Sequence, residues 1–243
     1  MNRREALFSI GAAAAGAGIA GRASAAELRG VPAATAQTAD HMPGPIVRGG
    51  DFKVFTDQTD HATLKAVFDR LIPSDDHGPS ASEAGVLDFL DAQLAGPYGD
   101  GAAYYLEGPL QPGHEEEVMG QKQFLETPRQ RYAKGLKALE QYAQDNDGAS
   151  FAALSPDRID EILTGMEAGR IDLPGGVFGQ AFFELMLQNA REGYLSDPIY
   201  GGNRDFAGWT MIGFPGARYD YRAYVDRHNE DLALAPVSLI PSN

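Results

Sequence analysis

Cysteine is absent from this chain of 243 residues, and its absence excludes several kinds of redox chemistry. Covalent attachment of c-type haem, thiolate metal sites, iron–sulfur clusters and cysteine nucleophiles all need a cysteine side chain. If the chain belongs to a redox system, it does not carry electrons by any of these means.

Basic residues are also scarce, with 20 Lys and Arg against 34 Asp and Glu and a formal net charge of −14. Nucleic-acid binding depends on neutralising phosphates with basic side chains. The balance therefore argues against a nucleic-acid partner. It suits a soluble exported protein, or a protein that meets a basic partner surface.

Long apolar runs are missing except near the start, where Arg3-Arg4 precedes a weakly apolar run over residues 6–20. Ala23-Ser24-Ala25 then supplies the small residues that signal peptidase prefers. The run is short and rich in Ala and Gly for a membrane anchor, and a buried Ala/Gly helix is the other alternative. We predict a twin-arginine signal peptide over residues 1–25, on the pathway that exports folded proteins.

Cleavage of this leader would leave 218 residues with 17 basic and 33 acidic side chains, enough for one domain with a real core. Residues 26–50 are rich in Ala, Pro, Thr and Gly, which predicts a flexible linker or arm. Residues 51–55 could form a short strand or an arm lying on the body. We expect residues 51–243 to form a single helical domain.

The fold class follows from apolar spacing. Period-two strands and fixed-length repeats are not found, and the spacing predicts an all-α, irregular helical domain with long ordered loops. Thr127-Pro128 and Ser155-Pro156 are cap-and-proline starts, and Gly193 is a plausible left-handed stop. The predicted helices cover residues 57–71, 81–94, 128–144, 155–166 and 176–192, with a further helical region starting near Glu115. The inward face expected for the last of these helices carries Phe178, Phe182, Leu185, Met186 and Asn189.

One stretch is unlike the rest: residues 193–216, GYLSDPIYGGNRDFAGWTMIGFPG, which we call the aromatic segment. It holds six glycines, two prolines and five aromatics, including Trp209, the only tryptophan. Loops without fixed contacts rarely carry so many large rings, and glycine permits unusual turns. We expect an ordered irregular segment that either plugs its own core or meets a partner, and the residues leave both possibilities open.

Chemistry-bearing motifs are few. Asp75-Asp76-His77 suits a turn or a helix cap better than a metal site, and the chain has no nucleophile elbow or phosphate loop. Arg204 either makes a bidentate contact to a carboxylate or is neutralised by Asp197 and Asp205. We therefore predict no catalytic, cofactor-binding or metal site. Helical metal-ligand spacing is also absent among the five histidines, which are His41, His61, His77, His114 and His228.

The run AREGYLSDPIYGGNRDFAGWTMIGFPGA (residues 190–217) closely resembles the signature of the gluconate 2-dehydrogenase subunit 3 family. The stretch FDRLIPSDDHGPSASEAGVLDFLDAQLAGPYG (residues 68–99) and the twin-arginine leader are similar to that family as well. This family supplies the small, or gamma, subunit of membrane-associated, flavin-dependent sugar and sugar-acid dehydrogenases.

The resemblance implies that three subunits of a complex have different roles. In the family a large subunit carries FAD and oxidises the sugar, and a multi-haem cytochrome c subunit passes electrons towards quinone and anchors the complex. The small subunit has no redox centre. It binds the large subunit, which lacks an export signal, and aids its maturation and passage through the twin-arginine translocase. By this resemblance the chain is a non-catalytic periplasmic subunit, peripheral to the inner membrane, with FAD and haem c in its partners.

The aromatic segment supplies the expected partner contacts. For Trp209 and Phe214, burial in the chain's own core is the alternative. Two other functions stay open: a free-standing periplasmic sugar-binding protein, and a hydrolase using Glu184 with Asp197 or Asp205. The predicted partner-binding residues are Tyr200, Asn203, Arg204, Phe206, Trp209 and Phe214.

Overall fold

Six α-helices make up the regular structure, and no strand occurs in the part of the chain that the computed structural model describes. This confirms the all-α prediction. None of these helices is long and apolar enough to cross a membrane. The leader, most of the linker and the helical region expected near Glu115 lie outside the described residues. The structure describes residues 49, 51–102, 126–218 and 220–239. The helices are α2 (Gln58–Leu71), α3 (Val86–Leu94), α4 (Pro128–Asp147), α5 (Pro156–Glu167), α6 (Gly179–Leu195) and α7 (Ala207–Met211).

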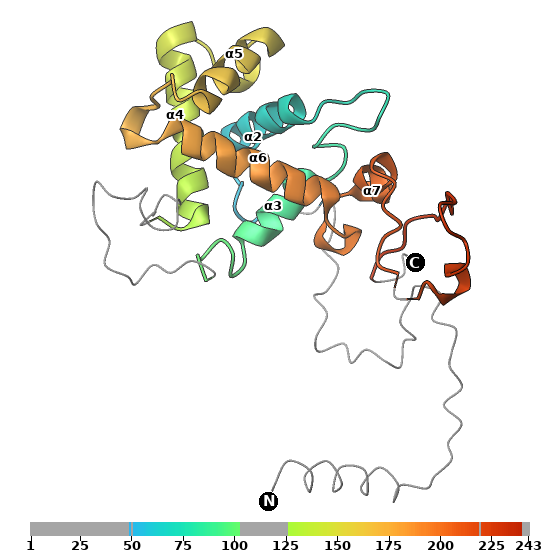
Figure 1. Cartoon of the computed structure of the whole chain (residues 1–243). Helices are drawn as coiled ribbons and strands as arrows, with labels where there is room; N and C mark the ends of the chain where they lie inside the picture. The colour runs from blue at the N-terminus through green and yellow to red at the C-terminus, as the bar shows by residue number, and fades with distance from the viewer. Residues whose placement is uncertain (1–48, 50, 103–125, 219, 240–243) are drawn as a thin grey trace, which may run out of the picture.

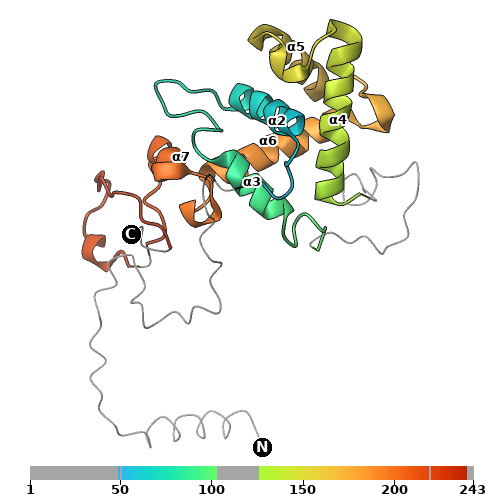
Figure 2. The same ribbon diagram turned by 180° about the vertical axis from the view of Figure 1, so that it is seen from behind.

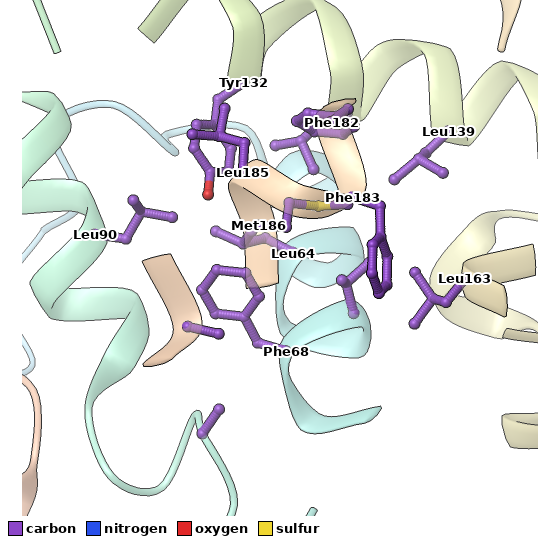
Figure 3. Packing of buried hydrophobic residues seen from close by; sticks show 14 of the residues in the cluster. Leu64, Phe68, Leu90, Tyr132, Leu139, Leu163, Phe182, Phe183, Leu185 and Met186 are labelled. Carbon is purple, nitrogen blue, oxygen red and sulfur yellow. The ribbon is translucent and has the colours of Figure 1, made fainter. Parts of the chain in front are cut away.

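Helix α6 is the scaffold of the domain, because it contacts each of α2, α3, α4, α5 and α7. In Figures 1 and 2 it crosses the molecule, with α4 and α5 near one end and α7 at the other. Buried side chains on several of its sides explain this position, since a helix that is apolar over most of its surface must be covered. Figure 3 shows neighbouring helices converging on it. The buried residues of α6 include Phe182, Phe183, Leu185, Met186 and Ala190.

The helix starts follow the cap signals in the sequence. Asp57 accepts the N–H groups of Thr59 and Asp60 at the start of α2. Thr127 forms a capping box with Gln130 at the start of α4, and Ser155 caps α5. Each side-chain oxygen satisfies a backbone donor that has no partner within the helix. The predicted starts of these three helices are confirmed.

Helix α3 begins five residues later than its apolar spacing predicted. Residues 81–85 form turns, and Gly85 ends them with a φ of +81°. That left-handed conformation cannot continue a right-handed helix and suits glycine. A Cβ at Gly85 would lie 2.5 Å from the carbonyl oxygen of Gly201, so the aromatic segment packs against this turn.

Both ends of α6 also differ from the prediction. Gly193 lies inside the helix, and a Cβ there would come within 2.8 Å of side-chain carbons of Val86 and Phe89. The glycine is needed for close packing of α3 on α6, and its prediction as a left-handed stop was wrong. Phe178 was expected on the inward face, but it is the N-cap residue and is 64% exposed.

The chain before α2 is an arm lying on the body, one of the two forms expected for residues 51–55. The buried carboxylate of Asp91 accepts the backbone N–H groups of Lys53, Val54 and Phe55 at 2.8–3.0 Å. Phe55 is buried in the core. A carboxylate that receives several backbone donors is a strong acceptor, so Asp91 fixes the entry of the chain into the domain.

The loop between α2 and α3 is held in a similar way by Asp69. Its carboxylate accepts the backbone N–H and the hydroxyl of Ser82 at 2.9 and 2.8 Å, and it pairs with Lys65. Burial raises the pKa of Asp69, but these hydrogen bonds outweigh burial and hold the pKa below its ordinary value of 3.8. The charged form is therefore favoured in the folded state.

Candidate functional site

The aromatic segment folds as an ordered cap on the C-terminal end of α6. After the last turn of α6 come two short 3-10 turns, Pro198–Tyr200 and Arg204–Phe206, and then the one-turn helix α7. Figures 1 and 2 show this cap at the end of the molecule opposite α4 and α5. The sequence predicted order without a regular period, but it gave no sign of α7.

Asn203 holds the cap together from inside. Its side chain is fully buried, donates to the carbonyl oxygen of Ser196 at 2.8 Å and accepts the N–H of Gly208 at 2.8 Å. Its φ is +47°, a left-handed conformation that Asn tolerates better than most residues. One amide thus connects the end of α6 with the start of α7. Asn203 was predicted as a residue that contacts a partner or supports such a contact, and its complete burial is compatible with the supporting form of that prediction.

Trp209 is also buried, with only 5% of its surface exposed. Its indole Nε1 donates to the carbonyl oxygen of Leu195 at 2.7 Å. Phe206 stacks on it with ring centroids 5.7 Å apart, and Phe214 meets it edge-on at 5.0 Å. Trp209 is therefore packed within its own chain, as the core interpretation expects for this residue.

Phe214, in contrast, is partly exposed to solvent, as are three other apolar side chains at the end of α6 and in and just after α7. Sequence reasoning missed three of the four, because α7 is too short to show a helical period. A signal was present in the Met-Ile pair at 211–212, which lies between the aromatics and glycines of the segment. We call these four side chains the α7 platform. Its members are Leu195 (39% exposed), Met211 (47%), Ile212 (55%) and Phe214 (43%).

The exposed apolar area of the α7 platform can be estimated from the exposed fractions of its four side chains. Taking roughly 190 Å² for a fully exposed large apolar side chain, the four exposed fractions amount to about 350 Å². Contiguous apolar patches of about 300–600 Å² are the largest on typical monomers and often mark interaction sites. Buried Trp209 contacts Phe214 edge-on, and the backbone N–H of Trp209 donates to the buried side chain of Asn203.

Arg204 is tied to the turn before α3 and to α3 itself. Its guanidinium donates to the carbonyl oxygen of Glu83 at 3.2 Å and to the carboxylate of Asp88 at 3.5 Å, and its backbone N–H donates to Ala84. In the alternative that Asp197 and Asp205 neutralise Arg204 and cap local turns, the neutralisation is wrong, because Arg204 pairs with Asp88, but Asp197 does cap the turn Pro198–Tyr200. The contact to Asp88 uses one nitrogen, so it is not the bidentate pair that was the alternative.

Asp197 has a different role, because it joins the cap to the end of the described chain. Its nearly buried carboxylate accepts the N–H of Ile199 at 3.0 Å, the hydroxyl of Ser238 at 2.6 Å and the N–H of Leu239 at 2.9 Å. We call the contacts with Ser238 and Leu239 the Asp197 clasp. All of these donors come from the chain's own residues.

An open groove of about 650 Å³ borders the platform. Phe89, Arg191, Glu192 and Tyr200 line it, and Leu195 belongs to both the groove and the platform. Tyr200 is half-buried and packs against the core from this side.

Acid–base chemistry finds little support among the described residues. Glu184 is exposed on α6, and the 11 residues from it to Leu195 rise about 16 Å along the helix axis, away from Asp197. Asp205 is exposed at the surface. Asp75 accepts the N–H groups of His77 and Gly78, so it stabilises a turn. No group of three or more His, Asp or Glu able to hold a metal occurs in the described part of the chain.

The fold and the site together define an all-α protein whose main surface feature is an apolar platform on a fixed helical scaffold. Apolar surfaces of this size are often functional. A family model for gluconate 2-dehydrogenase subunit 3 matches residues 58–216, which include every described α-helix and the aromatic segment. The chain belongs to the gluconate 2-dehydrogenase subunit 3 family, which implies a subunit of such dehydrogenase complexes. No curated protein and no solved structure matches the chain.

Proposed function

We propose that this chain is the non-catalytic small subunit of a periplasmic, FAD-dependent sugar or sugar-acid dehydrogenase. It binds the flavoprotein large subunit, which holds the FAD, and aids its maturation and twin-arginine export. A multi-haem cytochrome c subunit is the indirect partner and carries the haem. The family membership supports the complex, and the α7 platform is the observation that supports docking.

The platform suits docking because hydrogen bonds and packing within the chain fix its position. Asn203 and Trp209 fix α7 to the end of α6 through three side-chain hydrogen bonds of 2.7–2.8 Å. A preorganised surface loses little conformational freedom when it binds. Covering Met211, Ile212 and Phe214 would remove their apolar surface from water and shield a matching apolar surface on the flavoprotein.

Export follows from the same association. Residues 1–25 would carry the twin-arginine signal for both proteins, so the flavoprotein would cross the inner membrane only when it is bound. This mechanism needs a complex that forms in the cytoplasm and stays folded. The acidic charge of the chain would suit a basic rim on the flavoprotein surface.

Co-purification of the two subunits from a co-expressing strain tests docking. Met211→Ser together with Ile212→Ser removes the most exposed part of the platform without touching buried groups. We expect an unchanged thermal melt and at least a tenfold loss of captured flavoprotein. Phe178→Ser is the matched control, because it removes an equally exposed apolar side chain at the opposite end of α6. Capture of flavoprotein at the wild-type level by the double variant would refute docking through the platform.

A second experiment tests export. Arg3→Lys combined with Arg4→Lys should leave the flavoprotein in the cytoplasm while the two subunits still co-purify. Fractionation and an immunoblot for the flavoprotein measure this. If the flavoprotein reaches the periplasm in the double variant, the chain does not supply its export signal.

A sugar-binding protein is the second candidate, and the groove is the observation that favours it. Phe89 and Tyr200 are the aromatic residues of its lining, and Arg191 and Glu192 are charged residues of the lining. Calorimetric titration of the purified chain with hexoses and their aldonic acids separates the candidates. Saturable binding that Tyr200→Ala abolishes would support the sugar-binding function, and the subunit function predicts no binding by the isolated chain.

A further inference from the structure

The chain continues beyond the aromatic segment into a loop that is closed at its base. The described residues 217–218 and 220–236, which we call the C-terminal loop, begin after Gly216 and return to Val237. Gly216 and Val237 form a parallel bridge, and the N–H of Ala217 donates to the carbonyl oxygen of Val237 at 2.7 Å. The match to the family ends at residue 216, so the loop lies outside the part of the chain that the family model describes.

The base of the loop is fixed to the platform's own support. The Asp197 clasp holds Ser238 and Leu239 against the cap, and the N–H of Val237 donates to the carbonyl oxygen of Pro215, next to Phe214. A buried carboxylate with short charge-assisted hydrogen bonds is a firm anchor. Figures 1 and 2 show the loop beside α7 at the same end of the molecule.

The loop also exposes apolar side chains, although most of its charges are engaged with one another. Tyr221 is 41% exposed and Val225 is 61% exposed. Arg222 pairs with Asp220 at 2.6 Å, and Arg227 pairs with Glu230 at 2.7 Å. Loops longer than about 12–15 residues with little regular structure are uncommon in compact domains and are often functional.

The exposed apolar area of the platform is smaller than the area that each partner buries in a stable interface of standard size. A stable interface of standard size covers about 800 Å² on each partner, whereas the platform alone supplies about 350 Å² on the estimate above. By the same estimate Tyr221 and Val225 add about 200 Å² of apolar surface, and the polar backbone between them adds more. Because the loop begins three residues after Phe214, a body docked on the platform will meet it.

From these observations, and resting on the proposed function, we propose that the C-terminal loop is a second contact arm for the flavoprotein large subunit. The arm extends the interface beyond the α7 platform, and the Asp197 clasp sets its position. Its apolar contacts fit a partner surface with exposed apolar side chains. An anionic membrane does not fit this description, because the loop has no excess of basic residues to attract it.

Binding kinetics of the full-length chain on immobilised flavoprotein test the arm. Tyr221→Ser with Val225→Ser should raise the Kd at least about tenfold, mainly through a faster dissociation rate. Phe178→Ser should leave the Kd unchanged. Ser238→Ala removes one of the two hydrogen bonds of the clasp without removing an apolar contact, and we expect a smaller rise in Kd together with faster hydrogen exchange at Val237 and Leu239.

The outcomes separate the arm from the proposed function. If the platform double variant loses binding while the loop double variant binds like the wild type, the arm is overturned and docking through the platform stands. If the wild-type chain does not bind the flavoprotein at all, the proposed function is refuted, and the contact arm that rests on it is refuted as well. If the loop variant instead abolishes a self-association seen by light scattering, with an unchanged Kd for flavoprotein, the loop contacts a second copy and the arm is overturned.

Discussion

Replacing Asn203 by Ala is the sharpest test of how the cap is built. The change removes the hydrogen bond to the carbonyl oxygen of Ser196 and the acceptor for the N–H of Gly208, both at 2.8 Å. Each buried group left without a partner costs about 1–3 kcal/mol. Alanine at a φ of +47° adds about 1 kcal/mol. The expected local destabilisation is therefore about 3–7 kcal/mol.

The loss should be confined to the cap, because Asn203 does not belong to the main hydrophobic core. Trp209 is the only tryptophan and is buried beside Asn203, so its fluorescence reports on the cap alone. Far-UV circular dichroism reports mostly on the helices of the main body. In a urea titration of the variant, the fluorescence transition should move to lower urea than the dichroism transition.

Two further variants separate the contributions. Asn203→Gly loses the same hydrogen bonds but accepts a positive φ, so it should be about 1 kcal/mol less destabilised than Asn203→Ala. Asn203→Asp keeps the acceptor for Gly208 but loses the donor to Ser196. If both transitions of Asn203→Ala stay within about 0.5 kcal/mol of the wild type, the buried amide does not hold the cap and the reasoning is refuted.

Three other changes probe separate contacts. Asp91→Asn should cost about 1–3 kcal/mol and speed hydrogen exchange of the N–H groups of residues 53–55; unchanged protection there would contradict the role of this carboxylate. Gly208→Ala places a Cβ 2.1 Å from the carbonyl oxygen of Tyr194, so α7 must shift, and the tryptophan fluorescence should move to longer wavelength at an unchanged helix content. Asp69 has a lowered pKa in the folded state, so its stabilisation is present above its ordinary pKa of 3.8 and is lost as the pH falls below that value. The difference in unfolding free energy between wild type and Asp69→Asn should therefore be constant near neutral pH and shrink below about pH 4; a difference of the same size at acidic and neutral pH would exclude this titration.

Helix positions were predictable where the signals were local. Caps such as Thr127 and Ser155 act on backbone groups three residues away, so the sequence contains the whole interaction. The glycines were predicted less well, because their roles depend on distant partners. Gly193 looked like a helix stop, but the rings and methyls of α3 require its small size. Nothing in its sequence neighbourhood indicates that α3 would pack there.

The candidate site was predictable in place but not in detail. Composition alone marked residues 193–216 as ordered and unusual, and the structure confirms order in this segment. The sequence could not show which residues of the segment are buried and which are exposed. Its three short helical elements contain only three to five residues each, which is too few to show a period. The Asp197 clasp joins residues about 40 positions apart, and only the fold brings such pairs together.

The two interpretations of the aromatic segment, core plug and partner surface, describe different layers of one structure. Asn203 and Trp209 form an inner layer whose polar groups are satisfied by the chain itself, and Met211, Ile212 and Phe214 form an outer layer that stays 43–55% exposed. Changes in the inner layer should therefore lower stability and, through the displaced platform, binding as well. Changes in the outer layer should lower binding alone, because exposed side chains contribute little to folding. At each position, the loss of stability relative to the loss of binding shows which layer a residue belongs to. Phe214 contacts both Trp209 and solvent, so its substitution should lower stability and binding to intermediate extents.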